Sequence, residues 1–176
     1  MKRNAVYGVG IGINGRKAAM QATQHALNEL GADKPVLALV FVAQEFNINE
    51  VLVGLTGLLG DTPLWGFSTI SPITGEGEQP RSVVVALLTG SELKAQVHWY
   101  PNYAQDSAAA ARQFLQALKQ DIFLPQEILL AADGINGSLE PVCSALGMLK
   151  VNVTGAMAAG EPSQGKTYGI GKNQAG

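Results

Sequence analysis

Continuous apolar runs, and not alternating ones, mark the strands of this chain. The clearest runs lie at 36–42, 82–88 and 127–132. Runs of this kind are typical of strands buried on both faces, as in parallel sheets that are covered by helices. Between them, apolar residues recur at helical spacing, at about 19–30, 51–59, 111–118 and 139–146. Helices that alternate with buried strands predict an α/β fold.

Polar residues at the ends of the helical stripes predict where the helices begin. Asn47 and Glu50 give the second helix an N-cap and a capping-box-like start, and Asp106 or Ser107 begins the third. Pro141 is tolerated in the first turn of the fourth. We expect strands at about 4–10, 35–43, 62–67, 82–88, 93–99, 126–132, 150–155 and 165–171.

The second half of the chain repeats the element order of the first. Pro35 and Pro125 lie 90 residues apart, as do Glu50 and Glu140. We therefore predict two similar βαβαββ repeats, at about 1–90 and 91–176, within a single domain that covers 1–176. Because the chain ends directly after a predicted strand, we expect it to be a piece of a longer protein.

Composition excludes several classes of protein. Only 15% of the 176 residues are charged, below the roughly 25% of an average soluble domain, so a disordered chain is not expected. Twelve Lys and Arg residues, scattered singly against 14 Asp and Glu, argue against a nucleic-acid surface. The longest apolar run, 36–43, is far shorter than the ~20 residues that span a bilayer, so no membrane insertion is expected. The N-terminus shows no secretory signal, which favours the cytoplasm.

Small and hydroxyl residues follow two of the predicted strands at equivalent places in the two repeats. They are Gly66, Ser68 and Thr69 in the first repeat and Gly155 and Ala156 in the second. Open α/β sheets bind ligands at the carboxyl ends of their strands, so these residues are candidates for a ligand site. The alternative is a turn that contains a satisfied hydroxyl group.

A third candidate segment contains Asp133, Gly134 and Asn136, at the end of the buried strand 126–132. An acid at such a position is costly unless it is paired, hydrogen-bonded or solvated. Asp133 could receive the ammonium group of a ligand, while a neighbouring helix N-terminus receives a carboxylate. A helix-capping role is an equally good interpretation.

Gly10, Gly12 and Gly15 match the G-x-G-x-x-G pattern of a dinucleotide-binding turn, between a predicted strand and a predicted helix. The pattern also needs an acid at the end of the second strand. Asp33 precedes that strand, and Glu45 lies 30 residues beyond Gly15, too far along the chain. A flexible glycine turn is therefore the favoured interpretation.

The remaining candidate residues are isolated. His25 is expected on the polar side of the first helix, His98 lies beside aromatic residues, and Cys143 is expected as a core thiol on an apolar stripe. A single cysteine excludes an internal disulfide and a cysteine-based zinc site. Nothing in the motifs argues for catalysis.

Several segments resemble one known family. Residues 38–43, 49–55 and 63–69 resemble the N-terminal part of the FIST domain of F-box and intracellular signal transduction proteins, and 82–87 resembles its Val-rich strand. Asp133-Gly134 and 153–156 are similar to its later Asp-Gly and Gly-Gly-Ala positions. Phe67 stands where a cysteine is common in the family, and Ala156 where a second glycine is common.

The resemblance implies a non-catalytic sensory domain that binds a small, amino-acid-like ligand between its two repeats. It also implies a C-terminal FIST domain and a downstream signalling protein as partners. Some members are haem-binding gas sensors, so a haem site that uses His98 or His25 stays open as an alternative. A dinucleotide-binding enzyme domain is the other alternative, and the sequence leaves the cofactor undecided.

Overall fold

The chain alternates helices and strands, which confirms the α/β class expected from its buried apolar runs. The computed structural model describes residues 4–120 and 125–176. In chain order the helices and strands are β1 (Ala5–Ile11), α1 (Gly15–Leu30), β2 (Leu37–Ala43), α2 (Ile48–Leu59), β3 (Leu64–Thr69), β4 (Ile73–Thr74), β5 (Gly77–Glu78), β6 (Ser82–Leu88), α3 (Ser107–Gln120), β7 (Glu127–Asp133), α4 (Glu140–Gly147), β8 (Asn152–Ala158), η1 (Pro162–Gln164), β9 (Gly169–Gly171) and β10 (Gln174–Ala175).

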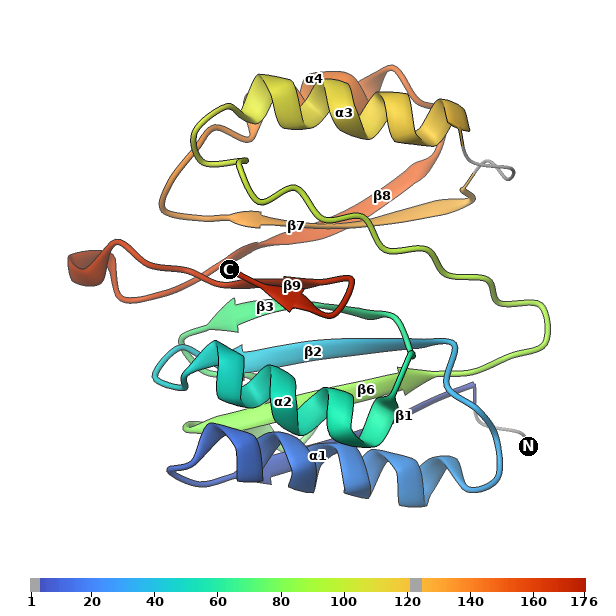
Figure 1. The fold of residues 1–176 in the computed structure, drawn as a ribbon, viewed down its shortest axis with the longest axis vertical. Coiled ribbons are helices and arrows are strands. Elements are labelled where there is room, and N and C mark those ends of the chain that lie inside the picture. The colour runs from blue at the N-terminus through green and yellow to red at the C-terminus, as the bar shows by residue number, and fades with distance from the viewer. Residues whose placement is uncertain (1–3, 121–124) are drawn as a thin grey trace.

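Six strands form the main sheet, in the order β1-β6-β2-β3-β9-β10. β6 runs antiparallel to both β1 and β2, whereas β2 and β3 are parallel. The strands β1, β2 and β3 therefore point the same way, and their carboxyl ends lie at one side of the sheet (Figure 1). This is the side at which α/β sheets bind their ligands.

Helices α1 and α2 cover one face of the main sheet (Figure 1). Their apolar stripes pack on the buried side chains of β2, β3 and β6, and the main hydrophobic core lies between the two layers. As predicted, the side chain of Asn47 caps α2, where it accepts hydrogen bonds from the amides of Asn49 (3.0 Å) and Glu50 (3.3 Å). Asn14 caps α1 in the same way, through the amide of Lys17 at 2.9 Å. These local caps thus fix the residue at which each helix begins.

Glycines in β1 allow α1 to approach the sheet closely. A Cβ atom added at Gly8 would lie 2.2 Å from the carbonyl oxygen of Ala22, and one at Gly10 would lie 1.8 Å from that of Ala18. Gly12, by contrast, has open space at its Cβ position. The first two glycines are therefore required by helix–strand packing.

The second half of the chain builds a smaller layer with its own core. The strands β7 and β8 form a separate two-stranded parallel sheet, and α3 and α4 pack over one of its faces (Figure 1). Asp106 caps α3 through the amide of Ala109 at 2.7 Å, which confirms the predicted start of that helix. β8 is exposed from Asn152 to Met157.

The strand expected at 93–99 is wrong: the segment has no regular secondary structure and joins none of the sheets that the described residues form. Gly169 and Gly171 of β9 pair with Phe67 and Trp65 of β3, so β9 occupies the place beside β3. The ring of Trp99 lies against these two glycines, where an added Cβ would come within 2.7 and 3.0 Å of it. The segment therefore crosses the face of the main sheet that carries the aromatic side chains of Trp65 and Phe67.

Other differences are smaller. The sequence did not predict the β4–β5 hairpin or β10, and the strand expected at 165–171 is limited to Gly169–Gly171. The order α3-β7-α4-β8 parallels α1-β2-α2-β3, with a parallel strand pair in each half. The internal duplication itself stays a prediction. Among the described residues, no helix is both long and apolar enough to cross a bilayer.

Replacing Gly10 with alanine should destabilise the protein by about 2 kcal/mol or more, because its methyl group would collide with the backbone of α1. The matched control is Gly12→Ala, which adds the same methyl group in open space and should leave the free energy of unfolding within about 0.5 kcal/mol of the wild type. Urea denaturation of the three proteins tests this. Equal effects at the two positions would contradict the packing role.

Candidate functional site

A small polar pocket lies at the carboxyl end of the parallel strands. One wall is formed by Gln44 and Glu45, which directly follow β2, and the other by the segment 159–168, which connects β8 to β9. The pocket has a volume of about 120 Å³. Its lining residues are Gln44, Glu45, Glu161, Gln164, Lys166 and Tyr168. No ligand-binding residue had been predicted within either wall.

The lining combines charges of both signs with neutral polar groups. Glu45 and Glu161 supply carboxylates, and Lys166 supplies an ammonium group. The Oε1 atom of Gln44 is buried and has no hydrogen-bond partner within residues 4–120 and 125–176. An unpartnered buried acceptor is costly, so a donor on a bound molecule would stabilise it. The pocket can thus bind a small molecule that carries both a donor cation and an acceptor anion.

Ser68 of β3 fixes both ends of the 159–168 segment. Its side chain is fully buried; the hydroxyl donates to the carbonyl of Ala159 at 2.8 Å and accepts from the amide of Tyr168 at 2.9 Å. Its backbone bonds the same two residues: the Ala159 amide donates to the Ser68 carbonyl, and the Ser68 amide to the Tyr168 carbonyl, both at 2.8 Å. Since every polar group of Ser68 is used in this way, its role is to position the pocket wall.

Asp133 and Asn136 fix the middle of the same segment. The Nδ2 group of Asn136 donates to the carbonyl of Gly165 at 3.1 Å and to the carboxylate of Asp133 at 3.0 Å. The carboxylate also accepts from the amides of Ile135 (2.8 Å) and Asn136 (2.9 Å). Partial burial alone would raise the pKa of Asp133, but these bonds and one from the Thr167 side chain outweigh it and hold the pKa below its usual value.

The other predicted site residues serve packing or secondary structure. Gly66 and Gly155 allow two neighbouring strands to lie close to them. A Cβ atom added at Gly66 would lie 2.0 Å from the Val40 carbonyl oxygen, and one added at Gly155 would lie 2.5 Å from the Leu130 carbonyl oxygen. Gly155 and Ala156, expected after a strand, lie inside β8. The other two predicted residues make hydrogen bonds to the backbone. The Gly134 amide donates to the Ala158 carbonyl at 3.1 Å, and the Thr69 hydroxyl donates to the Ser71 carbonyl at 3.3 Å.

Ser68, Asp133 and Asn136, which the sequence predicted as ligand-binding residues, hold the pocket wall in place. The residues that line the pocket were not predicted. Gln44 and Glu45 follow a predicted strand directly, so the strand-end rule that selected Ser68 could have selected them as well. The segment 159–168 gives no local signal. Its position depends on β9 joining β3, a long-range pairing that the repeat pattern does not indicate.

The glycine pattern at Gly10, Gly12 and Gly15 lies in the wrong sheet context for a dinucleotide-binding turn. β1 is the edge strand of the main sheet, and its partner β6 is antiparallel. A dinucleotide-binding turn instead follows a central strand with parallel neighbours. As shown above, α1 occupies the space that Gly10 leaves.

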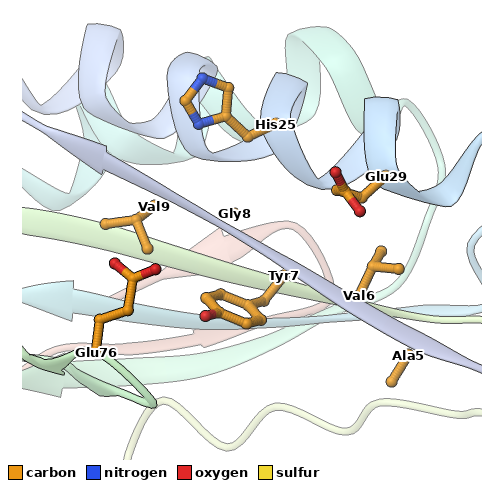
Figure 2. A pocket seen from close by; sticks show the side chains of 8 residues that line it. All are labelled: Ala5, Val6, Tyr7, Gly8, Val9, His25, Glu29 and Glu76. Atoms are coloured by element: carbon orange, nitrogen blue, oxygen red, sulfur yellow. The ribbon is translucent and has the colours of Figure 1, made fainter.

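The isolated candidates stay separate in space. His25 is exposed on α1 and lines a groove beside β1 (Figure 2), whereas His98 stacks on Tyr100 with ring centroids 6.4 Å apart. Across the described residues, no group of three or more His, Cys, Asp or Glu side chains could hold a metal ion. The core position expected for Cys143 is wrong: the thiol is exposed, because the buried stripe of α4 consists of Val142, Ala145 and Leu146.

The fold defines an α/β domain with a small polar pocket at the carboxyl ends of its parallel strands. A family model described as the FIST N domain matches residues 36–175, most of the chain, so the chain belongs to this family. The resemblance noted in the sequence is thereby confirmed, and the family consists of sensory domains of signal transduction. Searches among curated proteins and among solved structures gave no match.

Removing the Ser68 hydroxyl should loosen the pocket wall. Ser68→Ala leaves the Ala159 carbonyl and the Tyr168 amide each without one bond, and should lower the free energy of unfolding by about 1–3 kcal/mol. Ser71→Ala is the matched control, because the buried hydroxyl of Ser71 has no partner in the described part of the chain. It should be neutral or slightly stabilising. A Ser68→Ala protein as stable as Ser71→Ala would contradict the positioning role.

The stability that Asp133 contributes should depend on pH. A carboxyl group whose pKa is lower in the folded state stabilises the fold above its unfolded pKa of about 3.9, and this contribution is lost as the pH falls through the lower folded pKa. Asp133→Asn should therefore cost about 1 kcal/mol at pH 7, with the difference from the wild type narrowing below about pH 4. Asp61→Asn, in an exposed turn, is the control. A constant difference from pH 7 to 3 would argue against an ionised Asp133 as the anchor.

Proposed function

We propose that this domain is a sensory module that binds a small, amino-acid-like ligand in the polar pocket between β2 and the 159–168 segment. The observation that carries the proposal is the lining itself. Carboxylates from Glu45 and Glu161 and the ammonium group of Lys166 surround one cavity at the carboxyl end of the parallel strands. This charge arrangement is complementary to a zwitterion.

Each charged group of an amino acid has a counterpart in the lining. The ligand's carboxylate pairs with Lys166, and its ammonium group donates to Glu45 or Glu161 and to the buried Oε1 atom of Gln44. Bonds between charged partners are about twice as strong as neutral ones, and each adds geometric selectivity. Ser68, Asp133 and Asn136 take part as positioning residues, because they hold the segment that carries Glu161 and Lys166.

The size of the pocket favours a ligand of few heavy atoms. A volume of 120 Å³ corresponds to about four water molecules at ~30 Å³ each. Sites for larger ligands measure about 300–1,000 Å³. A dinucleotide or a haem therefore suits this pocket less well than an amino acid does.

Ligand binding can produce a signal because the pocket joins two parts of the fold. Gln44 directly follows β2 of the main sheet, whereas Lys166 lies on the segment that Asn136 ties to the second half. A ligand that bridges these residues stabilises one arrangement of the halves over others. It shifts the equilibrium by its difference in affinity for the two arrangements. No catalytic step is part of this proposal.

The partners in this proposal are a C-terminal FIST domain and a downstream signalling protein. The exposed strand β8 supports a docked neighbour, because Val153 and Met157 are 41% and 47% exposed on it. Large apolar side chains on an uncovered strand are typical of a surface that another domain contacts.

A thermal-shift screen of the proteinogenic amino acids, with NAD, ATP and haemin alongside, tests the proposal, followed by calorimetric titration of each hit. A binding amino acid should raise the melting temperature by several degrees at about one hundred times Kd. Lys166→Gln should weaken binding about tenfold or more, since it removes a charged hydrogen-bond donor.

Lys150→Gln is the matched control, because Lys150 is exposed outside the pocket, and it should leave Kd unchanged. Glu161→Gln should weaken binding in the same sense as Lys166→Gln. Affinity that is insensitive to both pocket variants, or a shift by haemin or NAD alone, would reject the proposed site.

A further inference from the structure

The charges that line the polar pocket do not balance. Glu45 and Glu161 supply two carboxylates, whereas Lys166 supplies one ammonium group, so the lining carries one net negative charge. Within residues 4–120 and 125–176, no ion pair joins Lys166 to either glutamate. The two charges of a zwitterion pair with Lys166 and with one of the carboxylates. The other carboxylate is then left to face a further part of the ligand.

Each carboxylate is carried by a turn of the backbone on its own wall of the pocket. Glu45 lies in the turn that is closed by a 3.1 Å hydrogen bond from the Phe46 amide to the Ala43 carbonyl. Glu161 directly precedes the one-turn helix η1, and its Oε1 atom accepts a hydrogen bond from the Ser163 hydroxyl at 3.1 Å. The two carboxylates therefore approach a bound molecule from opposite sides.

The buried Oε1 atom of Gln44 indicates which carboxylate pairs with the ligand's ammonium group. A Cβ atom added at Gly160 would lie 3.6 Å from this oxygen, so the oxygen lies beside the wall that continues into Glu161. An ammonium group that donates to Oε1 of Gln44 is thus at the Glu161 wall. The Glu45 carboxylate makes no hydrogen bond or ion pair with the described residues, and it is left for the ligand's side chain.

We propose that Glu45 selects the side chain of the ligand, so that the pocket binds small amino acids whose side chain donates a hydrogen bond and excludes those whose side chain is anionic. This inference rests on the proposed function and adds the class of amino acid to it. A hydroxyl or an amide NH2 group donates to the Glu45 carboxylate, whereas a second carboxylate on the ligand is repelled by it. Serine and asparagine belong to the favoured class, and aspartate and glutamate to the excluded one.

Selection by charge differs from selection by size in its dependence on salt. The Glu45 side chain is exposed, so mobile ions screen its charge. The screening length falls from about 30 Å at 0.01 M ionic strength to about 3 Å at 1 M. The preference for a neutral over an anionic side chain should therefore decrease as salt is added. A preference that is set by the shape of the pocket would not change.

Calorimetric titration of the full chain with asparagine and with aspartate tests the inference, because the two ligands are nearly equal in size and differ in side-chain charge. At low salt, asparagine should bind about fivefold tighter than aspartate. In Glu45→Gln the ratio of the two Kd values should fall below about twofold, since the repelling charge is gone. Glu78→Gln, which removes an exposed carboxylate outside the pocket, is the matched control and should leave the ratio unchanged.

The outcomes separate this inference from the proposed function. Absence of binding by every amino acid would overturn both. Equal affinity for asparagine and aspartate, or a ratio that Glu45→Gln and high salt leave unchanged, would overturn the selection by Glu45 alone. Binding of alanine without binding of either asparagine or aspartate would assign the selectivity to size and overturn the inference as well.

Discussion

The rest of the site depends on two hydrogen bonds that the buried Ser68 hydroxyl makes to distant parts of the chain. The segments that it joins, at Ala159 and Tyr168, lie 91 and 100 residues away in sequence. Through these bonds the end of β8 meets β3, and the chain enters β9 in register with β3. Because the hydroxyl is buried, losing either partner would leave an unsatisfied polar group. The pocket wall is held in place by this requirement.

Local features of the fold could be predicted because they depend on neighbouring residues. The apolar runs identified β2, β6 and β7, since a strand covered on both faces needs continuous apolar side chains. Asn47 and Asp106 identified helix starts, since a side-chain cap satisfies amides within three residues. The close packing of α1 on β1 is also visible in the sequence, as a glycine at position 10. The glycine pattern that contains Gly10 had a second interpretation, as a dinucleotide-binding turn.

Features that depend on long-range pairing could not be predicted. Residues 93–99 have a composition that suits a strand, but β9 already occupies the free side of β3. Trp99 then finds its place over Gly169 and Gly171, a fit that no local pattern reveals. Cys143 lies next to the buried Val142, about 100° further around α4, and the packing of this helix on its neighbours decides which of the two is covered. The candidate pocket escaped prediction for the same reason, because four of its six lining residues come from the 159–168 segment, which β9 positions.

The same long-range pairing explains why a small ligand could have a large effect on this fold. The 159–168 segment is held at its ends by Ser68 and in its middle by Asn136, through hydrogen bonds that contribute about 1 kcal/mol each. A ligand that adds one charge-assisted bond between this segment and β2 contributes a comparable amount. Since about 1.4 kcal/mol changes an equilibrium tenfold, a ligand bound as proposed would be enough to change the balance between a docked and a loosened segment. The proposed function depends on this near-equality between the hydrogen bonds within the protein and those to the ligand.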